Sequence, residues 1–153
     1  MEILEEQERL NTDYSEQLEI WFGYGFNGKL RLHVGGTNWL DSDINMIEYN
    51  HWNHIVGLWD GNEARIYANG ILVANGNSGL DNPNPHTFTL GSRLNNNSNQ
   101  VLGRLDEINL FNYSLSIEEI NNLYLLDYNP SSSSASYKFN YGEGNLLYDG
   151  SSN

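Results

Sequence analysis

The sequence predicts an all-β protein of short antiparallel strands, with one short helix toward its C-terminal end. Three two-residue turns support this prediction, namely Asn27-Gly28, Asp60-Gly61 and Asn69-Gly70. Such pairs are strong hairpin signals, because type I′ turns need a positive φ at both central residues. Beside the first turn, Leu30, Leu32 and Val34 alternate with polar residues, which gives a strand one apolar face. At 153 residues the chain is long enough for one domain with a single core.

The predicted strands follow one another through hairpins rather than through strand–helix–strand units. They cover residues 17–26, 29–36, 51–60, 63–69, 71–76, 86–92 and 103–112. Residues 51–76 are the most regular part and predict a three-stranded meander. Residues 37–51 read as a long polar connection, and Pro83 and Pro85 exclude regular structure from the loop that follows the meander.

Residues 116–126 predict the one convincing helix. Ser116 can cap its first turn while Glu119 reaches back, which is a capping box. The apolar residues expected on one face are Ile117, Ile120, Leu123 and Tyr124. Residues 129–136, "NPSSSSAS", have the composition of a flexible linker.

The charge balance restricts the partners. Seven basic and 20 acidic residues give a net charge of −13, which argues against nucleic acid and against anionic membrane surfaces. No apolar window is long enough for a membrane-spanning helix, and the acidic N-terminus does not resemble a signal peptide. The absence of cysteine excludes disulfides and thiolate metal sites.

One long stretch also follows a family pattern in order. It consists of "NHWNHIVGLWDGNEARIYANGILVANG", then "FTLGS", then "GRLDEINLFNYSLSIEEINNLY", and it spans residues 50–125. This stretch resembles the second half of a laminin-G-like domain of the concanavalin A-like lectin/glucanase superfamily. The resemblance implies a two-sheet antiparallel jelly-roll sandwich with one short C-terminal helix. It also makes Trp52 a core residue and His54 a hydrogen-bonded structural histidine.

The family pattern is out of phase in this chain. The opening strand of the family is matched by "YKFNYGEGNLLYDGSSN", residues 137–153, at the C-terminus. We therefore expect a jelly roll without its usual opening strands over residues 1–128, a serine-rich linker over 129–136, and the opening strand over 137–153. That strand could close its own sandwich or that of a neighbouring copy, and the chain could equally be a fragment of a tandem array.

Neither a glucanase-type carboxylate pair nor a metal site formed by two histidines is expected. Retaining glucanases need two carboxylates about 5–5.5 Å apart, whereas Asp106 and Glu107 are neighbours on a predicted strand and would point to opposite faces. His51 and His54 would also lie on opposite faces, so they are not expected to share an ion. We therefore expect no enzymatic activity.

Calcium is a possible cofactor, since it prefers oxygen ligands. The run Asp41, Asp43, Asn45 imitates the start of an EF-hand, but Met46 replaces the required glycine and Trp52 the closing glutamate. The family resemblance implies a different calcium site, which ties the opening loop to the penultimate strand. Its ligands would be Asp106, Asp149 and Asn153; alternatively, Asp106 only bonds to backbone.

A carbohydrate site needs an aromatic platform and polar groups for hydroxyls. The candidates in loops are Trp39, Asn38, Asp41 and Asn96. Stacking would explain an indole in a polar loop, although Trp39 could equally plug the open end of the sandwich.

The expected function is a non-catalytic recognition or adhesion module that binds a carbohydrate or another cell-surface or matrix partner. The alternative is a structural subunit that self-associates by donating residues 137–149 as a strand. Either role predicts an extracellular location or the surface of a particle such as a virion.

Overall fold

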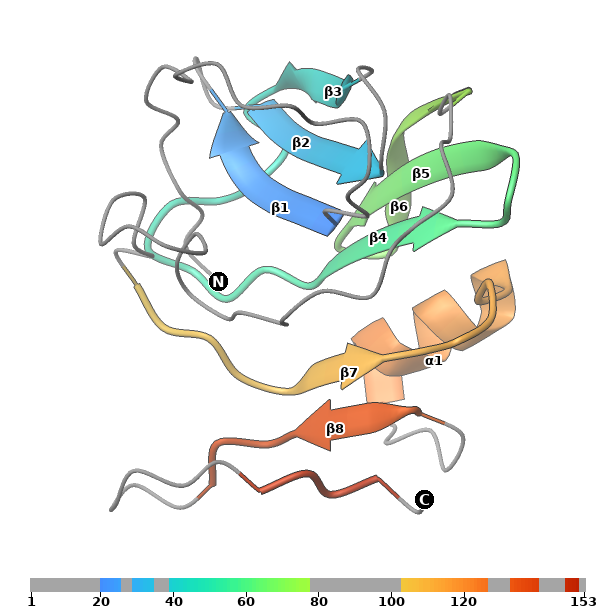
Figure 1. Ribbon diagram of the computed structural model, residues 1–153. Helices are drawn as coiled ribbons and strands as arrows, with labels where there is room; N and C mark the ends of the chain where they lie inside the picture. The colour runs from blue at the N-terminus through green and yellow to red at the C-terminus, as the bar shows by residue number, and fades with distance from the viewer. Residues whose placement is uncertain are drawn as a thin grey trace, which may run out of the picture.

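The part of the chain that the structure describes is mostly β, with antiparallel sheets and one short helix, which confirms the predicted class (Figure 1). The computed structural model describes residues 20–25, 29–34, 39–77, 103–126, 133–140 and 148–151. Its elements are β1 (Ile20–Gly25), β2 (Lys29–Val34), β3 (Trp39–Ile44), β4 (Ile55–Trp59), β5 (Glu63–Ala68), β6 (Ile71–Asn77), β7 (Ile108–Leu110), α1 (Ile117–Leu126) and β8 (Ala135–Tyr137). The predicted strand at residues 86–92 lies outside the described residues.

The first sheet has the order β1-β2-β3, and the predicted hairpin strands are its first two members. Residues 39–44, predicted as part of a polar connection, form β3 instead and pair with β2. The alternation of buried and exposed residues on β3 is not visible in the sequence, because one of its buried residues is polar. Leu40 packs against the core, and Ser42 is buried although it lies between two aspartates. The register shifts opposite Leu30, where Ser42 Oγ accepts a hydrogen bond from the Leu30 N–H at 2.9 Å. A hydroxyl therefore satisfies an amide that the irregular ladder would leave unpaired.

The second sheet is the predicted meander, with the order β4-β5-β6. Asn69 and Gly70 have φ values of 51° and 80°, as the predicted tight turn between β5 and β6 requires. Gly61, in the turn between β4 and β5, has a φ of 98°.

The two sheets pack face to face, with β2 against β5 and β3 against β6 (Figure 1). Facing side chains of β2 and β5 form the main core together with Ile47 from the connection between β3 and β4. The members of this core are Leu30, Leu32, Ile47, Ala64, Ile66 and Ala68. Partly buried residues of β3, β4 and β6 surround this cluster. Burying a side chain such as Ile66, which has no exposed surface, stabilises the fold by about 1.5–3 kcal/mol.

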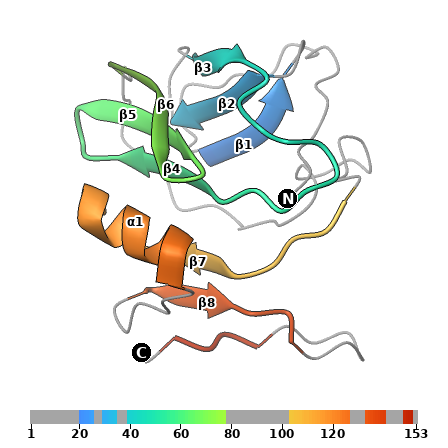
Figure 2. The same ribbon diagram turned by 180° about the vertical axis from the view of Figure 1, so that it is seen from behind.

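The opposite face of the meander is covered by α1 (Figure 2). Leu58 of β4 and Tyr67 of β5 form a second cluster there with Leu115 and Ile120. Adjacent residues of β5, Ile66 and Tyr67, are therefore both buried, although they point to opposite faces of the strand.

The predicted capping box of α1 is confirmed. The Glu119 N–H donates to Ser116 Oγ at 3.3 Å, and the Ser116 N–H donates to Glu119 Oε2 at 2.7 Å. The expected apolar face is only partly right: Ile120 is fully buried, whereas Ile117 and Tyr124 are exposed. The buried face of α1 is therefore narrower than the face predicted from its apolar residues.

The third sheet joins β7 to β8, with Ile108 opposite Tyr137. Residues 133–136, predicted as the end of a flexible linker, are part of this structure: residues 135–137 form β8, and Ser133 and Ser136 are buried. The rest of the predicted linker, residues 129–132, lies outside the described residues. The main chain of residues 148–151 continues along the other side of β8, where the Gly150 N–H donates to Ser136 O at 2.7 Å. Closure within one chain, as opposed to donation of residues 137–149 to a neighbour, stays a prediction.

His54 lies where the meander, its second turn and α1 meet. Its backbone exchanges two hydrogen bonds with Asn69, and its ring stacks on Tyr124 with centroids 5.7 Å apart. The expected hydrogen bond of the ring is not found at Nδ1, which is buried without a partner among the described residues. Burial lowers the pKa of His54 below its usual 6.5, because a charged imidazole would lose its hydration there.

We predict that replacing Gly70 by alanine destabilises the fold by about 1–3 kcal/mol. The new Cβ would be strained at a φ of +80° and would lie 3.1 Å from Tyr124 Cδ1 and 3.2 Å from Asn121 Oδ1. Gly61→Ala is the matched control, since its φ is also positive but nothing lies within 4 Å of the added carbon. Chemical denaturation measures both variants. Equal losses would mean that contact between the turn and α1 contributes nothing.

We also predict that stability falls as the pH is lowered from 7 toward 5.5. The pKa of His54 is lowered by folding, so the unfolded chain binds the proton first as the pH drops below about 6.5. The contribution of neutral His54 to the free energy of unfolding is complete above that pH. It is lost progressively as the pH falls to the lower pKa that His54 has in the folded protein. His54→Phe keeps a ring beside Tyr124 and should flatten this slope in thermal unfolding. If the slope is unchanged in His54→Phe, the pH dependence of stability comes from another titrating group.

Candidate functional site

The outer side of the β2–β3 hairpin brings together two of the predicted carbohydrate-binding residues. Trp39 and Asp41 are two residues apart on β3 and therefore share a face. Arg31 of β2 stands opposite Asp41 in the register. Its Nε donates to Asp41 Oδ1 at 2.6 Å and its Nη2 to Oδ2 at 3.0 Å, while the guanidinium lies 5.1 Å from the centre of the Trp39 ring.

In this arrangement both carboxylate oxygens of Asp41 accept hydrogen bonds from Arg31 of the neighbouring strand. The hydrogen bond from Arg31 lowers the pKa of the Asp41 carboxyl, so it stays ionised and paired. Arg31 covers one side of the indole through a cation–π contact, so Trp39 is half-buried rather than displayed. Sequence reasoning missed Arg31, although it stands among the polar residues that alternate with Leu30 and Leu32. Asn38 and Asn96 lie outside the described residues.

A second aromatic surface was not predicted. We call residues 48–53 the aromatic loop. Trp52, expected in the core, is 61% exposed, and Tyr49 is 52% exposed. The family pattern places this tryptophan in a strand, but β4 starts only at Ile55, so Trp52 stands in the connection before it. Glu48 and His51 are exposed beside the two aromatic residues.

The aromatic loop is fixed by one buried amide. Asn53 is only 6% exposed, and its Oδ1 accepts from the Glu48 N–H at 3.0 Å and from Asn69 Nδ2 at 3.2 Å. Its Nδ2 donates to Glu48 O at 2.8 Å and to His51 O at 3.0 Å. The buried Ile47 anchors the chain just before the loop. The exposed rings therefore project from a loop that is held at both ends.

Two of the three predicted calcium ligands, Asp106 and Asp149, lie among the described residues. Asp106 precedes β7, and its Oδ1 accepts a hydrogen bond from the Glu107 N–H at 2.9 Å. Asp149 lies beside β8, where its Oδ1 accepts from the N–H groups of Ser136 and Ser151, each at 2.9 Å. These bonds lower the pKa of Asp149, with the bond from Ser136 contributing most. Asn153 lies outside the described residues, so calcium binding stays a prediction.

The two carboxylates considered for catalysis, Asp106 and Glu107, lie just before β7 rather than on it, and both are exposed. Glu107 has a φ of 51°, a left-handed conformation that interrupts the strand. Within the part of the chain that the structure describes, no group of three or more His, Asp or Glu side chains could hold a metal ion. The helix among these residues is too short and too polar to cross a membrane.

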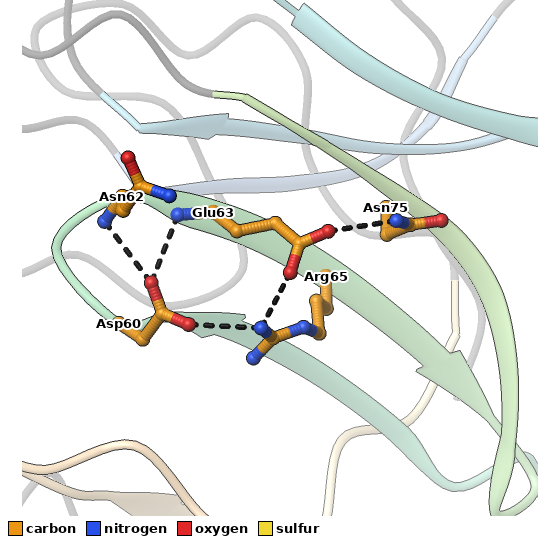
Figure 3. A network of polar contacts seen from close by, with 5 residues as sticks. All are labelled: Asp60, Asn62, Glu63, Arg65 and Asn75. Atoms are coloured by element: carbon orange, nitrogen blue, oxygen red, sulfur yellow. Dashed lines mark hydrogen bonds and ion pairs between the residues drawn. The ribbon is translucent and has the colours of Figure 1, made fainter.

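A network of polar contacts lies at the turn between β4 and β5 (Figure 3). Asp60 Oδ1 accepts from the N–H groups of Asn62 and Glu63, and its Oδ2 accepts from Arg65 Nη2 at 2.9 Å. Arg65 also donates to Glu63, whose other oxygen accepts from Asn75 at 2.7 Å. The backbone bonds lower the pKa of Asp60, and the Asn75 and Arg65 bonds lower that of Glu63. The network thus stabilises the turn and connects it to β6 through Asn75.

Comparison with known proteins places these features in a family. The model of the concanavalin A-like lectin/glucanases superfamily matches residues 5–121. No curated protein matches. Among solved structures, the chain is similar to residues 221–444 of an S-layer domain-containing protein from Clostridium thermocellum, with 18% identity and a TM-score of 0.39. That similarity covers 77% of this chain and 67% of the other.

The family match begins well before the stretch that carries the resemblance in sequence, and it includes all of β1 to β7. It ends within α1 and therefore leaves β8 and the C-terminal residues outside. Because it takes in well over half of the chain, the protein belongs to the concanavalin A-like lectin/glucanases superfamily.

Proposed function

We propose that this protein is a non-catalytic recognition module and that it binds a carbohydrate through its aromatic loop. The observation that carries the proposal is Trp52, a large indole that is 61% exposed on a loop fixed by the buried Asn53. An exposed tryptophan has an apolar face and one polar N–H, which suits a ligand with both apolar and hydroxylated surfaces. Fixing the loop in advance lowers the entropy lost on binding.

Polar groups for hydroxyls stand beside the rings. The Glu48 and His51 side chains are 77% and 70% exposed, with Glu48 Oε2 and His51 Nδ1 3.9 Å apart. His51 Nδ1 also lies 3.0 Å from Tyr49 O, so the imidazole is held in place while both side chains remain accessible to a ligand. Trp39 and Asp41, with Asn38 and Asn96, form the second candidate. Their use would require a ligand to approach the side of the indole away from Arg31.

The carboxyl groups support a role without catalysis. Glycoside hydrolysis needs a carboxylic acid that stays protonated, which requires a raised pKa. Among the described residues, the carboxyl groups with resolved shifts all have a lowered pKa, and they are Asp41, Asp60, Glu63, Glu119 and Asp149. Each of them is engaged by hydrogen bonds from its own neighbours.

Two finer points belong to the same proposal. The face-to-face packing of the two three-stranded sheets supports a two-sheet jelly-roll sandwich. A recognition role would place the protein outside the cell or on the surface of a particle, where glycans and matrix partners are met.

We predict that Trp52→Ala abolishes glycan binding, or weakens it at least about tenfold, on a glycan array and in titration of the best ligand. Tyr148→Ala is the matched control, because Tyr148 is also an exposed aromatic residue, at 68%, but lies in the C-terminal segment. Trp39→Ala tests the second candidate. Undiminished binding in Trp52→Ala with a loss in Trp39→Ala would move the site to the β2–β3 hairpin, and absence of any glycan ligand would contradict the proposal.

Calcium dependence is tested by thermal unfolding with calcium and with a chelator. We predict that Asp149→Ala lowers the melting temperature under both conditions, because its carboxylate accepts two backbone N–H groups. Asp106→Ala should cost less, since Asp106 accepts only the neighbouring Glu107 N–H. If calcium raises the melting temperature of the wild type and both variants lose that gain equally, the two aspartates share an ion.

A further inference from the structure

The carboxylate of Glu48 and the imidazole of His51 both present hydrogen-bond acceptors on the aromatic loop. A carboxylate only accepts, and the Glu48 side chain is 77% exposed. His51 Nδ1 lies 3.0 Å from Tyr49 O, a carbonyl oxygen that cannot donate, so Nδ1 carries the hydrogen of this bond. In the neutral ring Nε2 is then the nitrogen without a hydrogen, and it accepts from whatever approaches a side chain that is 70% exposed.

These two acceptors lie together. Glu48 Oε2 is 3.9 Å from His51 Nδ1. The Asn53 side chain holds their main chains at one point, because its Nδ2 donates to Glu48 O at 2.8 Å and to His51 O at 3.0 Å. One ligand group can therefore reach both side chains, directly before Trp52 in the chain.

The aromatic rings of the loop favour the same kind of ligand. Trp52 is 61% and Tyr49 is 52% exposed. The face of an aromatic ring is the negative side of its quadrupole and attracts cations, and tryptophan does so most strongly. The rings and the acceptors thus both suit a ligand that carries positive charge.

The charge of the surrounding chain acts in the same direction. No lysine or arginine occurs between residues 32 and 64, and that stretch contains the carboxyl residues Asp41, Asp43, Glu48, Asp60 and Glu63. The nearest cations along the chain on either side, Arg31 and Arg65, are bonded to carboxylates of their own. With a net charge of −13, the protein attracts a cationic ligand and repels an acidic glycan.

We propose that the carbohydrate bound by the aromatic loop carries a positively charged amino group, as in a glycan of unacetylated 2-amino sugars. Its ammonium group would meet the Glu48 carboxylate and His51 Nε2, and a sugar ring would stack on Trp52. This inference rests on the function proposed above, since it names the charge of the ligand at the same site. A basic protein fits less well, because a lysine side chain has no ring to lie flat on the indole.

Isothermal titration of the full chain with two tetramers tests the proposal. One consists of β-1,4-linked glucosamine, and the other is the same tetramer with every amino group acetylated. We expect the glucosamine tetramer to bind at least about tenfold more tightly, because only its amino groups carry charge. Trp52→Ala should weaken the binding of both tetramers.

Glu48→Gln should remove the preference by weakening the glucosamine tetramer alone. The bonds from Asn53 reach only the main chain of Glu48, so this substitution leaves the loop in place. Glu118→Gln is the matched control, because it removes the same charge from an exposed glutamate that lies on α1. It should change neither affinity.

Four results would overturn the inference. Equal or tighter binding of the acetylated tetramer, lost in Trp52→Ala, would leave the proposed function intact without the charge preference. Equal weakening by Glu118→Gln would assign the preference to the net charge of the protein. Tetralysine that binds as tightly as the glucosamine tetramer and is lost in Trp52→Ala would assign the loop to a basic protein. If neither tetramer binds, the ligand is another glycan, and the array with Trp52→Ala decides the proposed function alone.

Discussion

The burial of β5 on both faces is the constraint on which the rest of the structure depends. An antiparallel sheet commonly buries one face and leaves the other to water. Here Ile66 and Tyr67 are neighbours on the strand and are 0% and 8% exposed. The meander therefore needs a cover on each side, and it receives β2 and β3 on one and α1 on the other. The order of layers in Figure 1 follows from this requirement.

A few contacts at one corner of the meander connect its second turn to its first strand, to the aromatic loop and to α1. Asn69, forced into a positive φ by the tight turn, bonds to both backbone groups of His54 and to the Asn53 side chain. His54 in turn stacks on α1 through Tyr124. The same asparagine pair that joins the turn to the first strand of the meander also fixes the aromatic loop. Asn53 therefore links the turn of the meander to the proposed binding surface.

Local signals in the sequence were sufficient for the meander and the helix. The turn at Asn69-Gly70 and the capping box at Ser116 depend on residues within a few positions of each other, and both are confirmed. β3 and β8 could not be found in that way. Their polar and serine-rich sequences become strands through partners far along the chain, as when Ser42 Oγ satisfies the Leu30 N–H.

The candidate sites also depend on contacts that local sequence does not reveal, and the tryptophans show why. Trp59 packs against the core, Trp39 lies beneath Arg31, and Trp52 is open to solvent. The residue type is the same, and each stands in or beside a strand, so pattern alone could not rank them. What separates them is the element that covers each ring: the facing sheet, a cross-strand arginine, or nothing in the described structure. Recognition requires the third condition, because a ring already packed against its own protein has less apolar surface left to stack on a ligand.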